Sequence, residues 1–203
     1  MESNGIEWMD EKMNLTFDFA LMRMRIRIRT IAMIPTNNSS AVNAAIGAAA
    51  AGMAASYSQR KRDVASGSAV HAANLVSVLD HRTLLRAADD DAAAYAALQR
   101  TWKKDCALSP GEIDAIRRRA LEVPTALLER CHADCRAIHT FWKGGHCNPS
   151  IVSDAAVGFH ALAGAARAAY QTALVNDPPT PERERFKGLL RDIHRMEQEL
   201  LDL

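Results

Sequence analysis

The sequence predicts an all-α protein, a single bundle of about six or seven helices, and two observations carry this prediction. Apolar residues recur every three or four positions along most of the chain, which is the period of an amphipathic helix. Short breaks rich in Pro, Gly and Asn separate these stretches. Only the segment RMRIRIR at residues 23–29 alternates with the period of a strand, and it has no second strand with which to pair.

The first helices are expected between short polar breaks. Residues 37–40 (NNSS) are turn and N-cap residues, and the alanine-rich stretch 41–56 follows them. Its small side chains favour a buried helix that neighbouring helices approach closely. Further helices are expected over residues 66–79 and 81–104. The stretch LSPGE at 108–112 predicts the turn that follows.

Three more helices are expected in the second half. A long helix covers residues 112–142, with a bend at Pro124. The loop KGGHCNPS separates it from an Ala- and Gly-rich helix over residues 150–175. The break NDPPTPE leads into a last helix with Thr180 as its N-cap and Pro181 at its first position. The apolar stripe of this helix comprises Phe186, Leu189, Leu190, Ile193, Met196, Leu200 and Leu203.

Composition limits the class of protein. The chain has 203 residues, enough for one domain with a sizeable core. It is 48% hydrophobic but only 5% aromatic, so the core is expected to consist of small side chains. The net charge of +1 argues against a nucleic-acid partner, because such proteins usually carry a basic excess.

Residues 1–32 are assigned to an N-terminal extension of uncertain structure, and residues 33–203 to the helical domain. No signal peptide is expected, since residues 1–10 carry three acids and no basic residue. The apolar stretch 41–56 is shorter than the about 20 residues that cross a bilayer. Four cysteines in a chain of this length do not form a disulfide framework. A cytoplasmic protein without a membrane partner is therefore expected.

The stretch ADDDAAAYAAL at 88–98 places three aspartates in one helix. At about 100° per residue, Asp91 lies on the apolar face of this helix, whereas Asp89 and Asp90 lie on its flanks. That face comprises Leu84, Ala88, Tyr95, Leu98 and Trp102. Burial raises the pKa of a carboxyl group, and a raised pKa suits a general acid or base near neutrality. The alternative is that Asp91 only accepts hydrogen bonds from a neighbouring helix terminus.

DAAAY at 91–95 resembles the Asp-x-x-Ala-aromatic signature of the formiminotransferase-cyclodeaminase C-terminal domain, a family that includes stand-alone methenyl-tetrahydrofolate cyclohydrolases. RALEVPTALLERC at 119–131 resembles the family's helix with a Val-Pro step. CNPSIVSDAAVGF at 147–159 resembles its Gly-Asn-x-x-x-x-Ser-Asp motif, and ALVND at 173–177 its Asn-Val-x-x-Asn stretch. The resemblance extends over residues 33–203, and the order and spacing of the motifs carry it.

The resemblance implies an all-helical, cyclodeaminase-like homodimer with a folate site in a cleft at the subunit interface. It implies that Asp91 is the catalytic acid. The implied reactions are the cyclodeamination of 5-formimino-tetrahydrofolate to 5,10-methenyl-tetrahydrofolate and the hydrolysis of the methenyl compound to a formyl-folate. Both move a proton at a C1 unit between two folate nitrogens. Neither needs a metal or a redox cofactor, so a tetrahydrofolate derivative is the expected substrate.

The expected substrate-binding residues follow from the same motifs. The basic run in SQRKRD is assigned to the anionic tail of the folate. The pterin ring and the C1 unit are expected near Asp91 and Asn148. A capping role for Ser153 and a first-turn role for Asp154 are the alternative for that pair. The full set is Arg60, Lys61, Arg62, Asn38, Ser39, Tyr95, His146, Asn148, Ser153, Asp154 and Asn176.

Two departures from the family pattern keep a second hypothesis open. The family carries a Pro-Gly-Gly-Gly-Ser loop before its alanine helix, whereas this chain has PTNNSSAV at 35–42, without glycine. Glycine lets backbone N–H groups approach a ligand closely, so weak folate binding is expected. Cys147 stands where the family has glycine in the later motif. The alternatives are a folate C1 enzyme with an altered loop, a repurposed member that closes a ring on another small molecule, or a non-catalytic binding subunit.

Cys131, Cys135 and His139 lie one turn apart along one helix face. Such ligands suit zinc, but the first and third lie two turns apart and do not reach one ion on a straight helix. A Cys135–His139 nucleophile needs an accessible, electropositive thiol. Buried cysteines that act as small hydrophobic residues are the favoured interpretation.

Overall fold

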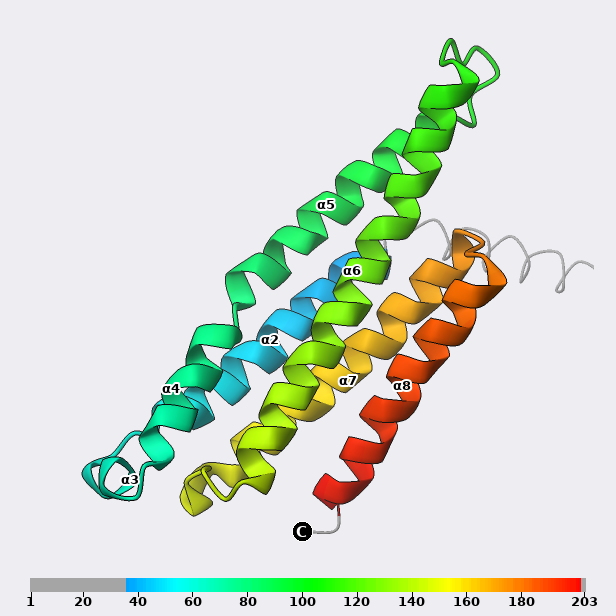
Figure 1. Cartoon of the computed structure of the whole chain (residues 1–203). Coiled ribbons are helices and arrows are strands. Elements are labelled where there is room, and N and C mark those ends of the chain that lie inside the picture. The colour runs from blue at the N-terminus through cyan, green and yellow to red at the C-terminus, as the bar shows by residue number, and fades with distance from the viewer. Residues whose placement is uncertain (1–35, 202–203) are drawn as a thin grey trace, which may run out of the picture. The chain divides into compact units, whose positions relative to one another are not determined.

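The computed structural model describes residues 36–201, with side chains from residue 39, and within this range the chain is helical and has no strand (Figure 1). The expected all-α class is confirmed. The segment RMRIRIR lies outside the described residues. The elements are α2 (Thr36–Ser56), α3 (Lys61–Ala65), α4 (Ser68–Val78), α5 (His81–Arg100), α6 (Pro110–Lys143), the 3-10 turn η1 (Pro149–Ile151), α7 (Val152–Val175) and α8 (Thr180–Leu201).

Helices α2 and α7 lie side by side and antiparallel, behind α6 in Figure 1. The Nδ2 of Asn43 donates a hydrogen bond to the carbonyl of Ala161 at 3.0 Å, and Gly47 faces Gly158 further along the same seam. Helix α5 packs on α2, and the long α6 packs on both α5 and α7. Helix α8 covers α6 and α7.

The seam between α2 and α7 consists of small side chains. Seven alanines of α2 are buried, at positions 41, 44, 45, 48, 51, 54 and 55. A Cβ atom on Gly158 would lie 2.7 Å from the backbone nitrogen of Ala51 and 2.7 Å from the carbonyl oxygen of Gly47. The two backbones therefore approach as closely as they do because Gly158 has no side chain. This is the close helix contact that the alanine-rich composition predicts.

Gly158→Ala should destabilise the protein by about 1–3 kcal/mol, because backbone atoms of α2 cannot move aside as a flexible side chain could. The matched control is Gly164→Ala on the same helix, where the added Cβ would meet only the Nδ2 of Asn43 at 3.6 Å. That control should be neutral or more stable, since alanine is the better helix former by about 1 kcal/mol. Urea denaturation measures both, and equal effects of the two substitutions would contradict the close contact.

Two expected helix boundaries are wrong. Helix α2 begins at Thr36, so residues 37–40 belong to its first turns and do not form a loop. Ser40 is buried with Ala41 and Ala44, and packing against the bundle outweighs the turn preference of Asn and Ser. Helix α5 ends at Arg100, and Trp102 is 55% exposed instead of completing the apolar stripe.

Helix α8 is docked by apolar and polar contacts together. Four residues of the expected stripe are buried: Phe186, Ile193, Met196 and Leu200. Three imidazole–carboxylate contacts flank this stripe, joining His132 to Asp192 at 2.8 Å, His139 to Glu199 at 3.0 Å and His160 to Glu197 at 3.1 Å. Within residues 36–201, no helix combines the length and the apolar character needed to span a bilayer.

Candidate active site

Asp91 is the buried member of the aspartate triplet on α5, with 7% of its surface exposed. Asp89 and Asp90 are exposed, as the helical periodicity predicts. Asp90 forms a 3.7 Å ion pair with Arg119 of α6 at the surface. Next to Asp91, Ala94 is also buried, so the carboxyl group lies on the face of α5 that packs into the bundle.

Tyr95 follows Asp91 by one helical turn and is half-buried. Its ring meets the ring of Trp102 edge to face, with the centroids 6.2 Å apart. Ser39 is exposed in the first part of α2, and the side chain of Asn38 lies outside the described residues. Tyr95 is thus the predicted site residue nearest to Asp91 along α5.

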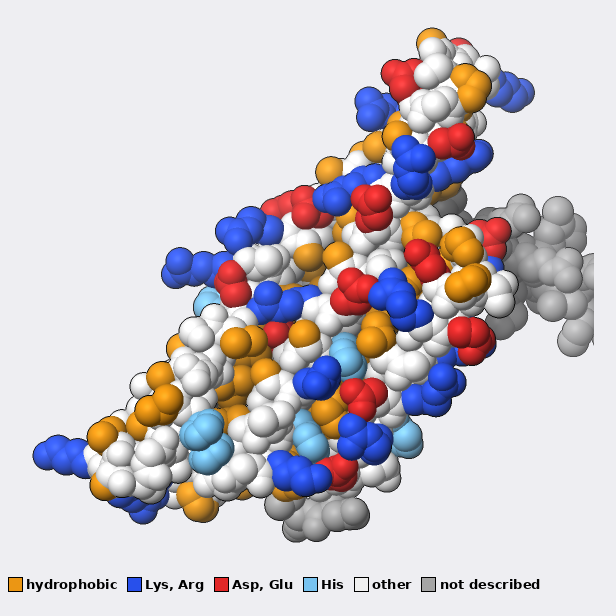
Figure 2. Space-filling view, viewed as in Figure 1, with side chains coloured by type: hydrophobic (Ala, Val, Ile, Leu, Met, Phe, Trp, Pro, Cys, Tyr) orange, Lys and Arg blue, Asp and Glu red, His pale blue; other side chains and the backbone are white. Residues whose placement is uncertain are grey.

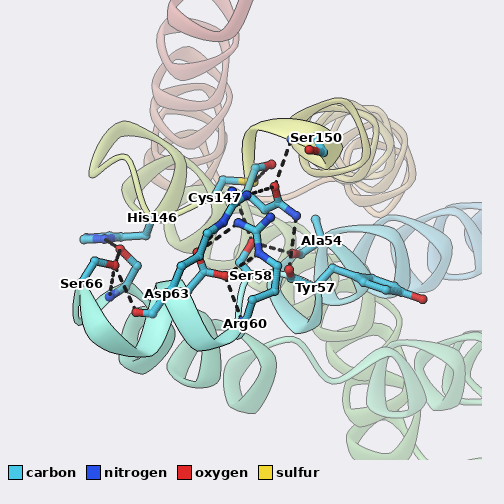
Figure 3. Close-up of polar contacts among 12 residues, drawn as sticks. Ala54, Tyr57, Ser58, Arg60, Asp63, Ser66, His146, Cys147 and Ser150 are labelled. Atoms are coloured by element: carbon cyan, nitrogen blue, oxygen red, sulfur yellow. Dashed lines mark hydrogen bonds and ion pairs between the residues drawn. The ribbon is translucent and has the colours of Figure 1, made fainter.

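A second polar cluster lies at the opposite end of α2 (Figure 3). Asn148 is buried there, and its backbone N–H donates a 2.8 Å hydrogen bond to the Oγ of Ser58. Its Nδ2 donates to the carbonyl of Tyr57 at 3.3 Å, and its Oδ1 accepts from the backbone N–H of Ser150 at 3.1 Å. Arg62 also donates to this Oδ1, at 3.4 Å. Asn148 therefore fixes the loop before α7 to the end of α2.

The three residues of the basic run beside Asn148, Arg60, Lys61 and Arg62, differ in their contacts. The Arg60 guanidinium donates to both carboxylate oxygens of Asp63, at 2.7 and 3.0 Å, and the Arg60 backbone N–H donates to the same carboxylate at 2.9 Å, at the start of α3. These hydrogen bonds hold the pKa of the Asp63 carboxyl below its ordinary value. Lys61 is exposed, and Arg62 is 63% exposed. Lys61 is thus open to an anionic ligand, whereas Arg62 is exposed but also lies 3.8 Å from the Asp63 carboxylate, and Arg60 is engaged with that carboxylate.

The remaining predicted site residues are dispersed. Ser153 is exposed and does not cap α7, because η1 runs directly into that helix and Asn148 caps η1 instead. The capping role considered for Ser153 is therefore wrong. Asp154 lies in the first turn of α7, as expected. Asn176 follows the other end of α7, where its Nδ2 donates to the carbonyl of Thr172 at 3.1 Å.

His146, one of the predicted substrate-binding residues, lines a cavity between α4 and α6. Asp91 is not among the described residues that line this cavity. The ring of His146 stacks on His71, a residue that sequence reasoning missed. No local pattern marks His71, because α4 brings it to His146 only in the folded bundle.

Asp91 and Asn148 lie at different levels of the bundle. Asp90, the neighbour of Asp91, pairs with Arg119, whereas Asn148 follows the end of α6 at Lys143. Between Arg119 and Lys143 the helix extends on the order of 35 Å at about 1.5 Å per residue. Within one chain, Asp91 and Asn148 therefore do not contact the same pterin ring.

Besides Asp63 and Asp91, the described residues include a third buried aspartate, Asp134 on α6, which sequence reasoning did not single out. Its side chain is fully buried, and the Nε of Arg130 donates to its two oxygens at 2.9 and 3.0 Å. Burial raises the pKa of Asp134 to about 6, although the Arg130 hydrogen bonds act in the opposite direction. An aspartate held by an arginine one turn earlier on the same helix has a structural role.

Cys131 and Cys135 are buried in the core, as the favoured interpretation predicts. Burial raises the pKa of the Cys131 thiol to about 12 and that of Cys135 well above its ordinary value. Their thiolates, which a metal or an electrophile would require, are therefore disfavoured. Among the described residues, no group of three or more His, Cys, Asp or Glu side chains is placed to share a metal ion.

The fold and this site define an all-α bundle with a buried candidate acid–base group on an alanine-rich helix. The family model described as formiminotransferase-cyclodeaminase matches residues 38–195, and the chain belongs to this family. The fold is similar to that of formiminotetrahydrofolate cyclodeaminase from Thermotoga maritima, with a TM-score of 0.66 and 16% sequence identity. The match covers 81% of this chain and 82% of that chain. No curated protein matches this chain.

Proposed function

We propose that this protein is a folate one-carbon enzyme of the cyclodeaminase or methenyl-tetrahydrofolate cyclohydrolase type, with Asp91 as its acid and base. The observation that carries the proposal is the burial of Asp91, alone among the three adjacent aspartates, within the span matched by the family model. A buried carboxyl group is shielded from water, so it can hold and release one proton next to a bound substrate.

The proposed chemistry requires one proton carrier. In cyclodeamination, N10 of 5-formimino-tetrahydrofolate bonds to the formimino carbon, whose imino nitrogen is already protonated. The bond from that carbon to this nitrogen then breaks, ammonia leaves, and the positive charge remains on the methenyl product. Asp91 takes the proton from N10 and delivers it to the departing nitrogen. In hydrolysis, water adds to the methenyl carbon, and Asp91 takes a proton from that water. One C–N bond of the adduct then breaks, Asp91 returns its proton to the leaving nitrogen, and the hydroxyl proton goes to solvent as the formyl group forms. The proposed reactions use no metal and no redox cofactor.

The proposed substrate site includes a second copy of the chain. Asp91 and the cluster around Arg62 and Asn148 lie too far apart in one copy to share a ligand. An antiparallel second copy would bring the Asn148 end of one chain toward Asp91 of the other. An exposed apolar stripe along α2 supports such a dimer, and this α2 stripe comprises Val42, Ile46, Met53 and Tyr57, exposed by 42%, 58%, 46% and 63%. Lys61 and Arg62 would then bind the glutamate tail.

Ile46→Lys should convert the proposed dimer into a monomer, because it places a charge in the middle of the α2 stripe. Light scattering at micromolar concentration measures the mass. The control is Leu85→Lys on α5, a residue of similar exposure outside the stripe, which should leave the mass unchanged. A wild-type monomer would overturn the proposed dimer, and so would an unchanged mass of the Ile46→Lys variant.

A second candidate function rests on the start of α2. Because Thr36–Ser56 is helical and residues 36–42 contain no glycine, the segment lacks the close backbone approach that the family's glycine loop provides. This feature favours a changed ligand, with Asp91 retained for ring closure on another small molecule, or a non-catalytic binding subunit.

Titration with 5,10-methenyl- and 5-formimino-tetrahydrofolate separates the two candidates. Loss of the methenyl chromophore reports cyclohydrolase activity, and its appearance reports cyclodeaminase activity. Turnover of either compound supports the folate enzyme. Binding without turnover supports a binding subunit, and the absence of both would overturn the folate assignment.

A further inference from the structure

The cavity between α4 and α6 has a volume of about 540 Å³, within the range of about 300–1,000 Å³ that small-molecule sites occupy. Its floor is apolar and is made by Leu75, Ala137 and Phe141, among others. Figure 2 shows this hollow with hydrophobic side chains inside it and histidines at its edge. The cavity is therefore large enough for a ligand with one or two rings.

One end of the cavity is a row of flat rings. The rings of His71 and His146 are parallel within 6°, with their centroids 3.7 Å apart. Phe141 continues the row, 6.4 Å from His146. Such rings pack well against another planar, unsaturated ring.

The end of α6 determines the position of His146. The backbone N–H of Gly145 donates to the carbonyl of Trp142, and that of His146 donates to the carbonyl of Phe141. Gly145 has φ of +69°, so this is a Schellman cap with glycine in the left-handed region. A Cβ on Gly144 would lie 2.6 Å from the His146 ring, so the ring can fold back over α6 only because Gly144 has no side chain.

Arg136 provides a positive charge on the wall of the same cavity. It is exposed, and none of the described residues that line the cavity carries a carboxylate. Within residues 39–201, no ion pair or side-chain hydrogen bond engages Arg136, in contrast to Arg130 and Arg167. The Asn74 amide and the Thr140 hydroxyl line the cavity with it. Donors that no carboxylate of the cavity wall engages can bind an anionic ligand.

We propose that this cavity binds a small aromatic carboxylate, with the carboxylate on Arg136 and the ring packed against Phe141 and the His71–His146 pair. This site goes beyond the proposed folate reaction and does not depend on it. The apolar floor provides the burial of the ring, while Asn74 and Thr140 orient the carboxylate.

The test uses three probes in calorimetric titrations of the whole chain. 2-Naphthoate carries both the charge and the ring, 2-naphthamide lacks the charge, and cyclohexanecarboxylate lacks the aromatic ring. We expect 2-naphthoate to bind about tenfold more tightly than either of the others, since the charge-assisted pair and the ring packing should each contribute about 1.4 kcal/mol, which is a factor of ten. Equal binding of all three probes, or no binding of 2-naphthoate, would overturn the proposal.

Substitutions test whether 2-naphthoate binds in this cavity. Arg136→Gln should weaken 2-naphthoate binding about tenfold. Arg118→Gln, which removes an exposed arginine of α6 outside the cavity, should not change it. Gly144→Ala should also weaken binding, because the added methyl group displaces His146. Equal effects of the Arg136 and Arg118 substitutions would overturn the assignment. Asp91→Asn should leave 2-naphthoate binding unchanged, so this site and the folate site can fail separately.

Discussion

Asp91→Asn should lower folate turnover by a factor of about 10² or more while the protein remains folded. Asparagine has nearly the same shape as aspartate, but its amide cannot take up and release a proton at neutral pH. The side chain is buried, so a water molecule does not readily replace the missing carboxylate. The measurement is the initial rate of methenyl-tetrahydrofolate hydrolysis, followed by the chromophore, with circular dichroism to verify the fold.

The neighbouring aspartates supply the controls for Asp91. Asp89 and Asp90 are exposed on the same helix, and Asp90 forms a surface ion pair with Arg119 at 3.7 Å. Exposed pairs of this kind contribute about 0–1 kcal/mol. Asp89→Asn and Asp90→Asn should therefore leave turnover and stability nearly unchanged. Turnover of Asp91→Asn equal to that of the wild type would refute the assignment of Asp91 as the proton carrier.

Arg130→Met should destabilise the protein by about 3–5 kcal/mol at pH 7.5, because it leaves the fully buried Asp134 carboxylate without its partner. Arg130 also donates a hydrogen bond to the carbonyl of Val78, which ties α6 to the end of α4. The expected loss should be smaller at pH 5, where protonation removes the charge of Asp134. Urea denaturation at the two pH values measures this difference.

The sign of the pH dependence follows from the raised pKa of Asp134. Its pKa is about 6 in the folded protein and 3.8 as the ordinary value, so the folded state binds the proton more tightly. The contribution of this group to stability is therefore fully present below pH 3.8 and is lost as the pH rises through about 6. Without Arg130, the pKa of Asp134 should rise further, because the hydrogen bonds that lower it are gone. The loss of stability should then extend to higher pH.

The double variant Arg130→Met/Asp134→Leu distinguishes two effects: the loss of the ion pair itself, and the cost of a buried carboxylate that has lost its partner. Replacing both partners by apolar residues of similar size is often neutral or stabilising. The double variant should therefore be more stable than Arg130→Met alone at pH 7.5. If the two variants are equally unstable at both pH values, the loss comes from packing and not from the uncompensated charge of Asp134.

The sequence alone was sufficient for those features that depend on local periodicity. The spacing of apolar residues predicted the all-α class and the course of α4, α6, α7 and α8 to within a few residues. The same spacing placed Asp91 on the buried face of α5 and its two neighbours at the surface. Each of these features is determined by side chains that lie a few residues apart on one helix, so the tertiary partners need not be known.

Only the tertiary structure shows which polar side chains form hydrogen bonds within the protein and which remain accessible to a ligand. The amide of Asn148, a predicted substrate-binding residue, donates to the carbonyl of Tyr57 at the end of α2, and its Oδ1 accepts from Arg62. Helix α2 extends through the expected loop because burial against the bundle outweighs the turn preference of its residues. The contact of His71 with His146 joins residues far apart in the chain. Such contacts form only when helices pack, and no local pattern encodes them.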